Sequence, residues 1–111
     1  MARKHWHILH ENGALTMARR VPVRFDLGVV TRLEGGCKHR IARQVRQDVW
    51  RALRDVRGFA PAVKVEDCDG GLKVTAGGQV DGVFPKQAAE TQITDVLENK
   101  ANRARWARWA S

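Results

Sequence analysis

The chain has 111 residues, 43% of them hydrophobic, and a formal net charge of +8. This length suits one domain with a single core, and the hydrophobic content excludes a fully disordered chain. The positive charge would attract nucleic acid, an anionic membrane surface or an acidic protein. Fourteen arginines outnumber six lysines, and the planar guanidinium group suits phosphate and aromatic partners.

The N-terminal residues lack the apolar stretch and cleavage site of a signal peptide. No run approaches the ~20 apolar residues of a membrane span. Two cysteines, Cys37 and Cys68, are too few for a disulfide scaffold. We therefore expect a cytoplasmic protein without a membrane span.

The first expected element is a hairpin. Asn12-Gly13 lies between two apolar-rich stretches, and this pair is preferred in two-residue hairpin turns. Met-Ala-Arg occurs at residues 1–3 and again at 17–19, so Met17 is an alternative start. In that case residues 1–16 form a dispensable N-terminal arm.

Apolar residues then alternate with polar ones over residues 21–27, which predicts a half-buried strand. Pro22 cannot donate a hydrogen bond to a neighbouring strand, so this strand is expected at an edge.

A helix is predicted from about Lys38 to Val56, where the net charge of residues 38–57 is +5. Its predicted core face consists of Ile41, Val45, Val49, Ala52, Leu53 and Val56. A second, exposed stripe on its polar side consists of Arg43, Arg46, Trp50, Arg54 and Arg57. Trp50 is therefore expected to point with the arginines and away from the core.

A second hairpin is predicted around the turn Asp67–Gly71, and Gly77-Gly78 is interpreted as a further turn. The closing helix is predicted to run from Lys86 towards Trp109. Its predicted apolar stripe consists of Ala89, Ile93, Val96, Leu97 and Ala104. In an unbroken helix Trp106 and Trp109 lie nearly opposite that stripe.

These elements predict an α+β fold of one domain, residues 1–111. We expect an antiparallel sheet built from two hairpins, with two helices packed on one face, in the order ββαββα. Residues 103–111 form a tail rich in tryptophan and arginine.

The arginine and tryptophan stripe is the best candidate site. Guanidinium groups bind phosphates, and an indole among them can stack on an exposed base. The predicted nucleic-acid-binding residues are Arg40, Arg43, Arg46, Trp50, Arg54 and Arg57. The alternatives are a protein interface and an ordinary solvated helix face.

The tail residues Arg105, Trp106 and Trp109 are predicted to make a protein contact, within the chain or between subunits. Stacking on bases and binding at a lipid headgroup layer are the alternatives.

We expect no metal, cofactor or catalytic site. The histidines and cysteines match no zinc template: these are His5, His7, His10, Cys37, His39 and Cys68. The acidic residues of the Asp67–Gly71 region are typical of a turn. Ser111 is the only serine, and no cysteine can be paired with a histidine from the sequence.

The sequence therefore predicts a small, basic, non-enzymatic protein that binds the phosphate backbone of RNA or DNA with little sequence selectivity. The alternative is a structural or adaptor subunit of a larger assembly, either a homo-oligomer or a phage-like complex, with the Trp-bearing faces as interfaces. A metal-dependent nuclease is the third hypothesis.

Overall fold

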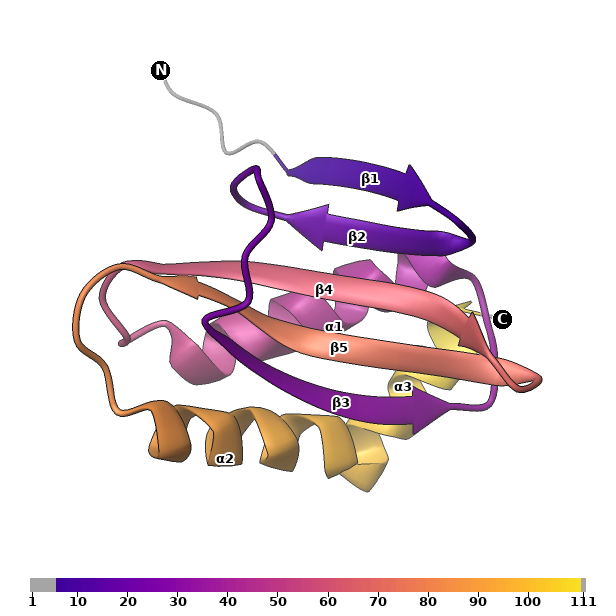
Figure 1. Ribbon diagram of the computed structural model, residues 1–111. Helices are drawn as coiled ribbons and strands as arrows, with labels where there is room; N and C mark the ends of the chain where they lie inside the picture. Colours follow the sequence, from indigo (N-terminus) through magenta and orange to yellow (C-terminus); the bar gives the residue numbers. More distant parts are fainter. Residues whose placement is uncertain (1–5, 111) are drawn as a thin grey trace, which may run out of the picture.

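The computed structural model describes residues 6–110, which form an α+β fold with a five-stranded antiparallel sheet and three helices (Figure 1). The elements are β1 His7–Glu11, β2 Ala14–Ala18, β3 Leu27–Leu33, α1 Lys38–Leu53, β4 Phe59–Cys68, β5 Gly71–Val80, α2 Lys86–Glu98 and α3 Lys100–Ala110. The strand order in the sheet is β1-β2-β4-β5-β3.

Both predicted hairpins are confirmed, and each is closed by two residues with positive φ. Asn12 and Gly13 have φ of 50° and 79°, and Asp69 and Gly70 have φ of 45° and 81°. Such backbone angles match the right-handed twist of the flanking strands, and Asn, Asp and Gly adopt them at low cost. Local turn chemistry therefore sets the register of β1 with β2 and of β4 with β5.

The predicted strand over residues 21–27 is wrong for most of its length, because β3 begins only at Leu27. In the sheet, β4 and β5 lie between β2 and β3, so the chain must cross both of them. The crossing segment is held at its end by Asp26, whose backbone N–H donates to the Gly78 carbonyl at 2.8 Å. The Asp26 carboxylate accepts from the Val80 N–H at 2.9 Å. The alternating apolar residues thus belong to a covering loop.

The described helices pack on one face of the sheet, and the other face, here called the open sheet face, is crossed by the loop before β3 (Figure 1). Alternate strand residues supply the sheet side of the core: Leu15, Met17, Leu27, Val63, Val65, Leu72, Val74 and Ala76. The helices supply Ile41, Ala42, Val45, Val49, Leu53, Ala89, Ile93, Leu97 and Trp106. Leu15 belongs to residues 1–16, so this segment contributes both β1 and a core residue to the sheet.

Helix α1 has the predicted core face but ends at Leu53, three residues earlier than expected. The Val56 N–H donates to the Leu53 carbonyl at 2.9 Å, which closes a turn beyond the helix. Arg57 therefore lies outside the helix.

The predicted closing helix is broken at Asn99, which gives three helices instead of two. Asn99 has extended backbone angles, with φ −67° and ψ 119°. Its side-chain oxygen accepts a hydrogen bond from the Asn102 N–H at 2.9 Å, as expected at a helix N-cap. The new helix direction buries Trp106 and exposes Ala104, whereas an unbroken helix would place Ala104 in the apolar stripe and Trp106 nearly opposite it.

Gly77 and Gly78 lie within β5 and do not form the expected turn. A Cβ atom added at Gly77 would lie 2.1 Å from the Leu27 carbonyl oxygen, and one at Gly78 would lie 2.2 Å from that of Ala60. Gly78 also has φ of 145°. Glycine is required here because the neighbouring strands approach closely.

Within residues 6–110, no helix is both long enough and apolar enough to cross a membrane.

The burial of Trp106 predicts a sharp difference between the two tail tryptophans. Trp106 is 0% exposed and Trp109 is 61% exposed. We expect Trp106→Ala to lower the free energy of unfolding by about 3–5 kcal/mol, because a buried aromatic side chain is lost. Trp109→Ala, the matched control, should change it by less than about 0.5 kcal/mol. Urea unfolding followed by circular dichroism measures both; equal effects would contradict this packing.

Candidate nucleic-acid interface

Helix α1 carries a strongly unbalanced charge. It contains the five basic residues Lys38, Arg40, Arg43, Arg46 and Arg51 and a single acid, Asp48. The Asp48 side chain is only 10% exposed, because it faces α3 and not the solvent. The outer surface of α1 therefore has arginines and no carboxylate of its own.

Asp48 is bound by two residues of the tail. One of its carboxylate oxygens accepts hydrogen bonds from the Trp106 indole N–H at 2.8 Å and from the Arg105 guanidinium. Arg105 also donates to the Asn102 side chain at 2.9 Å. Arg105 and Trp106 thus hold the tail on α1 through Asp48, and the interface predicted for Arg105, Trp106 and Trp109 stays a prediction.

The end of α3 is fixed beside the start of α1. The Ala110 carbonyl accepts a hydrogen bond from the Cys37 N–H at 2.7 Å. Trp109, one residue earlier, lies against the polar side of α1, where an open hollow of about 400 Å³ forms. The residues that line it are Arg40, Arg43, Gln44, Arg46, Gln47 and Trp109.

Arg46 is the most constrained member of this hollow. It is half-buried, although the sequence predicted an exposed side chain, and its guanidinium carbon lies 4.3 Å from the centre of the Trp6 ring. This is cation–π geometry. Its Nε atom is buried and has no hydrogen-bond partner among residues 6–110. Trp6 lies just before β1, so the stack joins α1 to the N-terminal hairpin.

The surroundings of Arg46 disfavour its positive charge. Burial, and then the neighbouring positive charge of Arg43, lower the pKa of Arg46 below its usual value. Within residues 6–110, no carboxylate forms an ion pair with Arg40, Arg43 or Arg46. An anion in the hollow would offset this repulsion.

The remaining residues of the predicted stripe lie further along α1 or beyond it. Trp50 is 40% exposed, and Arg54 and Arg57 are exposed at and after the helix C-terminus. None of the three lines the hollow. The structure thus brings Arg40, Arg43 and Arg46 together and leaves Trp50, Arg54 and Arg57 outside.

Sequence reasoning missed two aromatic neighbours of these arginines, Trp6 and Trp109. Both come from chain segments far from α1, so helix periodicity holds no trace of them. The position of Trp109 could have been anticipated from Asn99. Asparagine is a preferred N-cap residue, so Asn99 indicates that a new helix begins there, and this new helix carries Trp109.

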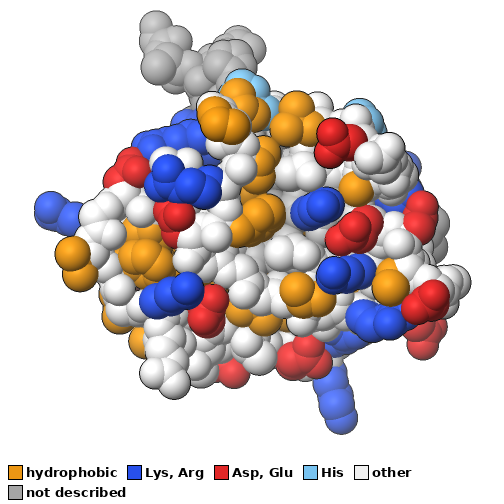
Figure 2. Space-filling model, viewed as in Figure 1, with side chains coloured by type: hydrophobic (Ala, Val, Ile, Leu, Met, Phe, Trp, Pro, Cys, Tyr) orange, Lys and Arg blue, Asp and Glu red, His pale blue; other side chains and the backbone are white. Residues whose placement is uncertain are grey.

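The open sheet face has a different charge pattern. Figure 2 shows basic and acidic side chains interspersed on that face. Lys73 lies 3.9 Å from Glu66, and Arg32 lies 4.0 Å from Asp69. Most of its charge is locally balanced, unlike that of the α1 surface.

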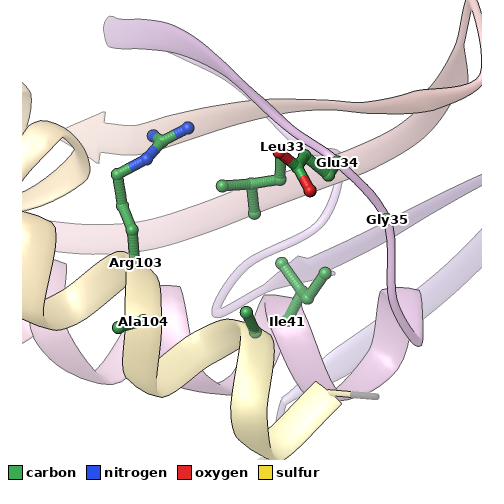
Figure 3. Close-up of a pocket in the computed structure, with 7 residues that line it drawn as sticks. Leu33, Glu34, Gly35, Ile41, Arg103 and Ala104 are labelled. Carbon is green, nitrogen blue, oxygen red and sulfur yellow. The ribbon is translucent and has the colours of Figure 1, made fainter.

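A second hollow of about 310 Å³ lies between the end of β3 and α3 (Figure 3). Its floor is mainly apolar, with Leu33, Ile41 and Ala104 among the lining residues. The Arg103 side chain at its rim turns toward β3 (Figure 3) and donates to the Thr31 hydroxyl of β3 at 3.1 Å and to the Leu97 carbonyl of α2 at 3.0 Å. Arg103 therefore links α3 to β3 and to the end of α2.

The histidines and cysteines do not gather into a metal site within residues 6–110, where no group of three His, Cys, Asp or Glu side chains could hold a metal ion. His10, Cys37 and His39 border one hollow near the first hairpin turn. His5 lies outside the described residues.

Comparisons with protein-family models, with curated proteins and with solved structures gave no match.

Metal removal gives a direct test of the side-chain arrangement. We expect thermal unfolding curves with and without a chelator to superimpose, because a structural zinc site would couple strongly to folding. Differential scanning calorimetry measures the midpoint. A drop of several degrees on chelation would show that ligands such as His10, Cys37 and His39 converge on a metal.

Proposed function

We propose that this protein binds nucleic acid through the arginine hollow of α1, with phosphates contacting Arg40, Arg43 and Arg46. The supporting observation is the cluster of Arg40, Arg43 and Arg46, in which Arg46 is half-buried and no arginine has a carboxylate partner among residues 6–110. Maintaining such repulsion lowers stability unless an anion is bound.

The geometry favours a polyanion over a single small anion. Arg54 and Arg57 continue the positive surface beyond the hollow, and Arg51 lies between them and the cluster on the same helix. A phosphate backbone can contact successive arginines along this surface, and each contact releases a counterion. Because such contacts carry no base information, the expected selectivity is low.

Trp109 supplies the second component of the proposed site. It is 61% exposed and lines the same hollow as the three arginines. An indole fixed next to phosphate-binding arginines can stack on an unpaired base, and any base offers a π face. The combination favours single-stranded RNA or DNA.

The alternative function is a subunit of a larger protein assembly. Trp50 and Trp109, with 40% and 61% exposure, are the observation in its favour, since tryptophan is enriched at interface hot spots. In that case Trp50→Ala and Trp109→Ala would dissociate an oligomer or release a partner. Light scattering of the wild-type chain and of these two variants distinguishes the two functions, because only an assembly through the tryptophan-bearing faces loses mass when Trp50 or Trp109 is replaced.

The arginine cluster predicts a specific loss of salt dependence. Binding of a mixed-sequence single-stranded oligonucleotide should weaken steeply as salt rises, because counterions are released on binding. The double variant Arg40→Ala, Arg43→Ala should lower the log–log slope by about 1.4, the value for two lost phosphate contacts. Fluorescence anisotropy over a salt series measures both affinity and slope.

The matched control is the double variant Lys64→Ala, Lys73→Ala on the open sheet face, which removes the same charge. It should leave the slope nearly unchanged. An equal loss in both variants would mean that binding follows net charge alone, and a loss in the control only would move the site to the sheet. Absence of binding at low salt would reject the proposal.

Base stacking on Trp109 predicts that Trp109→Ala weakens single-strand binding by about 1–3 kcal/mol. Duplex binding should change less, because paired bases do not expose their faces. Titration of both forms by isothermal calorimetry gives the comparison, with Trp50→Ala as a variant outside the hollow. A larger loss for Trp50→Ala would place the stacking site further along α1.

A further inference from the structure

The two edge strands of the sheet, β3 and β1, differ in whether side chains bind their outward-pointing backbone groups. At the β3 edge, the Gly28 N–H donates to the Glu90 carboxylate at 3.3 Å. The Arg103 guanidinium donates to the Arg32 carbonyl at the same edge. Side chains of α2 and α3 thus occupy outward backbone groups of β3, which protects this edge against further strand pairing.

The β1 edge has no such cover from the described residues. All five residues of β1 are exposed, and among residues 6–110 the strand pairs only with β2. Glu11 and Ala14 flank the two-residue turn, so they exchange both hydrogen bonds, and pairing then alternates along the hairpin. The N–H and C=O groups of Ile8 and His10 therefore point outward at the free edge.

We propose that this edge binds β1 of a second copy of the chain. The two strands run antiparallel, with Leu9 opposite Leu9 on the twofold axis. Ile8 of each copy then lies opposite His10 of the other, and these residues exchange backbone hydrogen bonds. The pairing uses the outward groups that the hairpin leaves open.

The sequence of β1 is complementary to itself in this register. His7 of each copy lies opposite Glu11 of the other, so a charged or hydrogen-bonded pair forms twice. These pairs and the Leu9 pair are non-hydrogen-bonded positions, where facing side chains approach most closely. The strand therefore matches its own copy on both its backbone and its side chains.

Neighbouring registers are less favourable. With Ile8 opposite Ile8, His7 faces Leu9, and with His10 opposite His10, Glu11 faces Leu9. Both registers replace the His7–Glu11 pairs by a contact between an ionisable side chain and an apolar one. Backbone pairing alone permits three registers, and side-chain complementarity favours the one centred on Leu9.

The resulting dimer has one continuous sheet. The twofold axis runs perpendicular to the sheet, so two five-stranded sheets join into ten strands and the helices of both copies lie on the same face. No residue of β1 lines the arginine hollow. A failure to form the dimer and a failure to bind nucleic acid can therefore be measured separately.

The experiment measures the mass of the full chain by sedimentation equilibrium, without nucleic acid. We expect a concentration-dependent dimer. His7→Glu should raise the dimer dissociation constant about tenfold, because two carboxylates then face each other twice, and Glu11→Lys should raise it too, because both His7–Glu11 pairs are lost. Mixing the two variants should restore the dimer, because the introduced Glu then faces the introduced Lys and the original His7 faces the original Glu11.

A cross-link tests the register directly. In a Cys37→Ser, Cys68→Ser background, Leu9→Cys places two thiols at a pair whose Cα atoms are about 4.5 Å apart, within disulfide range. It should form a covalent dimer on mild oxidation. Ile8→Cys is the matched control and should cross-link poorly, because the two copies of position 8 are not opposite each other.

Two results would overturn the proposal. One is a monomer at all concentrations up to about 1 mM, which covers weak association. The other is a dimer that withstands both charge variants and is lost with Trp50→Ala or Trp109→Ala, which would place the contact on α1.

Discussion

The contact of Asp48 with Arg105 and Trp106 determines how α3 packs on α1, and it turns the single acid of α1 away from the outer surface of that helix. Asp48 is the only acid of α1, and its carboxylate points at the tail. A buried carboxylate needs a cationic or hydrogen-bonding partner, and here it has both. This pairing buries Trp106 and brings Trp109 to the polar side of α1. It also leaves the outer face of α1 without an acid, so one internal contact establishes the arginine hollow.

The surroundings of Arg46 differ from those of the paired basic residues. Several arginines and lysines lie beside carboxylates, as in the pairs of Arg24 with Asp26 at 2.8 Å and Lys38 with Asp67 at 2.8 Å. Arg46 instead lies over Trp6 and beside Arg43. The Trp6 ring offsets part of the repulsion by cation–π attraction, which is weaker than an ion pair with a buried carboxylate. Residual positive potential at this place is what a phosphate ligand requires.

The sequence was a good guide where structure depends on near neighbours. Asn12-Gly13 and Asp69-Gly70 determine their turns by their own backbone preferences, and the spacing of Ile41, Val45 and Val49 gives the buried face of α1. The sequence was a poor guide where the position of a residue depends on segments far away in the chain. The apolar alternation of residues 21–26 arises because the segment crosses the open sheet face, a path set by strand order and not by local propensity. Trp106 likewise takes its burial from Asp48, 58 residues away.

The candidate site was predicted only in part for the same reason. Helix periodicity predicts that Arg43 and Arg46 lie on one side of α1, but it does not predict which residues from other segments cover that side. Trp6 comes from the segment before β1, and its ring makes Arg46 half-buried. Trp109 reaches the hollow only because Asn99 ends α2 and redirects the chain. Periodicity thus identified the arginines, and the tertiary fold supplied their aromatic neighbours.

The first hairpin connects the proposed dimer with the arginine hollow, because β1 extends beyond the helices that cover the sheet. Helix α1 packs over β4 and β2 and leaves β1 beyond the helical layer. This position opens the β1 edge and also lets Trp6 reach Arg46 from the side. If two β1 strands pair, the Trp6–Arg46 stacks of both copies lie on the same sheet face, on either side of the twofold axis. A long single strand could then contact both arginine surfaces at once, and the second contact would be intramolecular, which raises affinity without any new protein–phosphate chemistry.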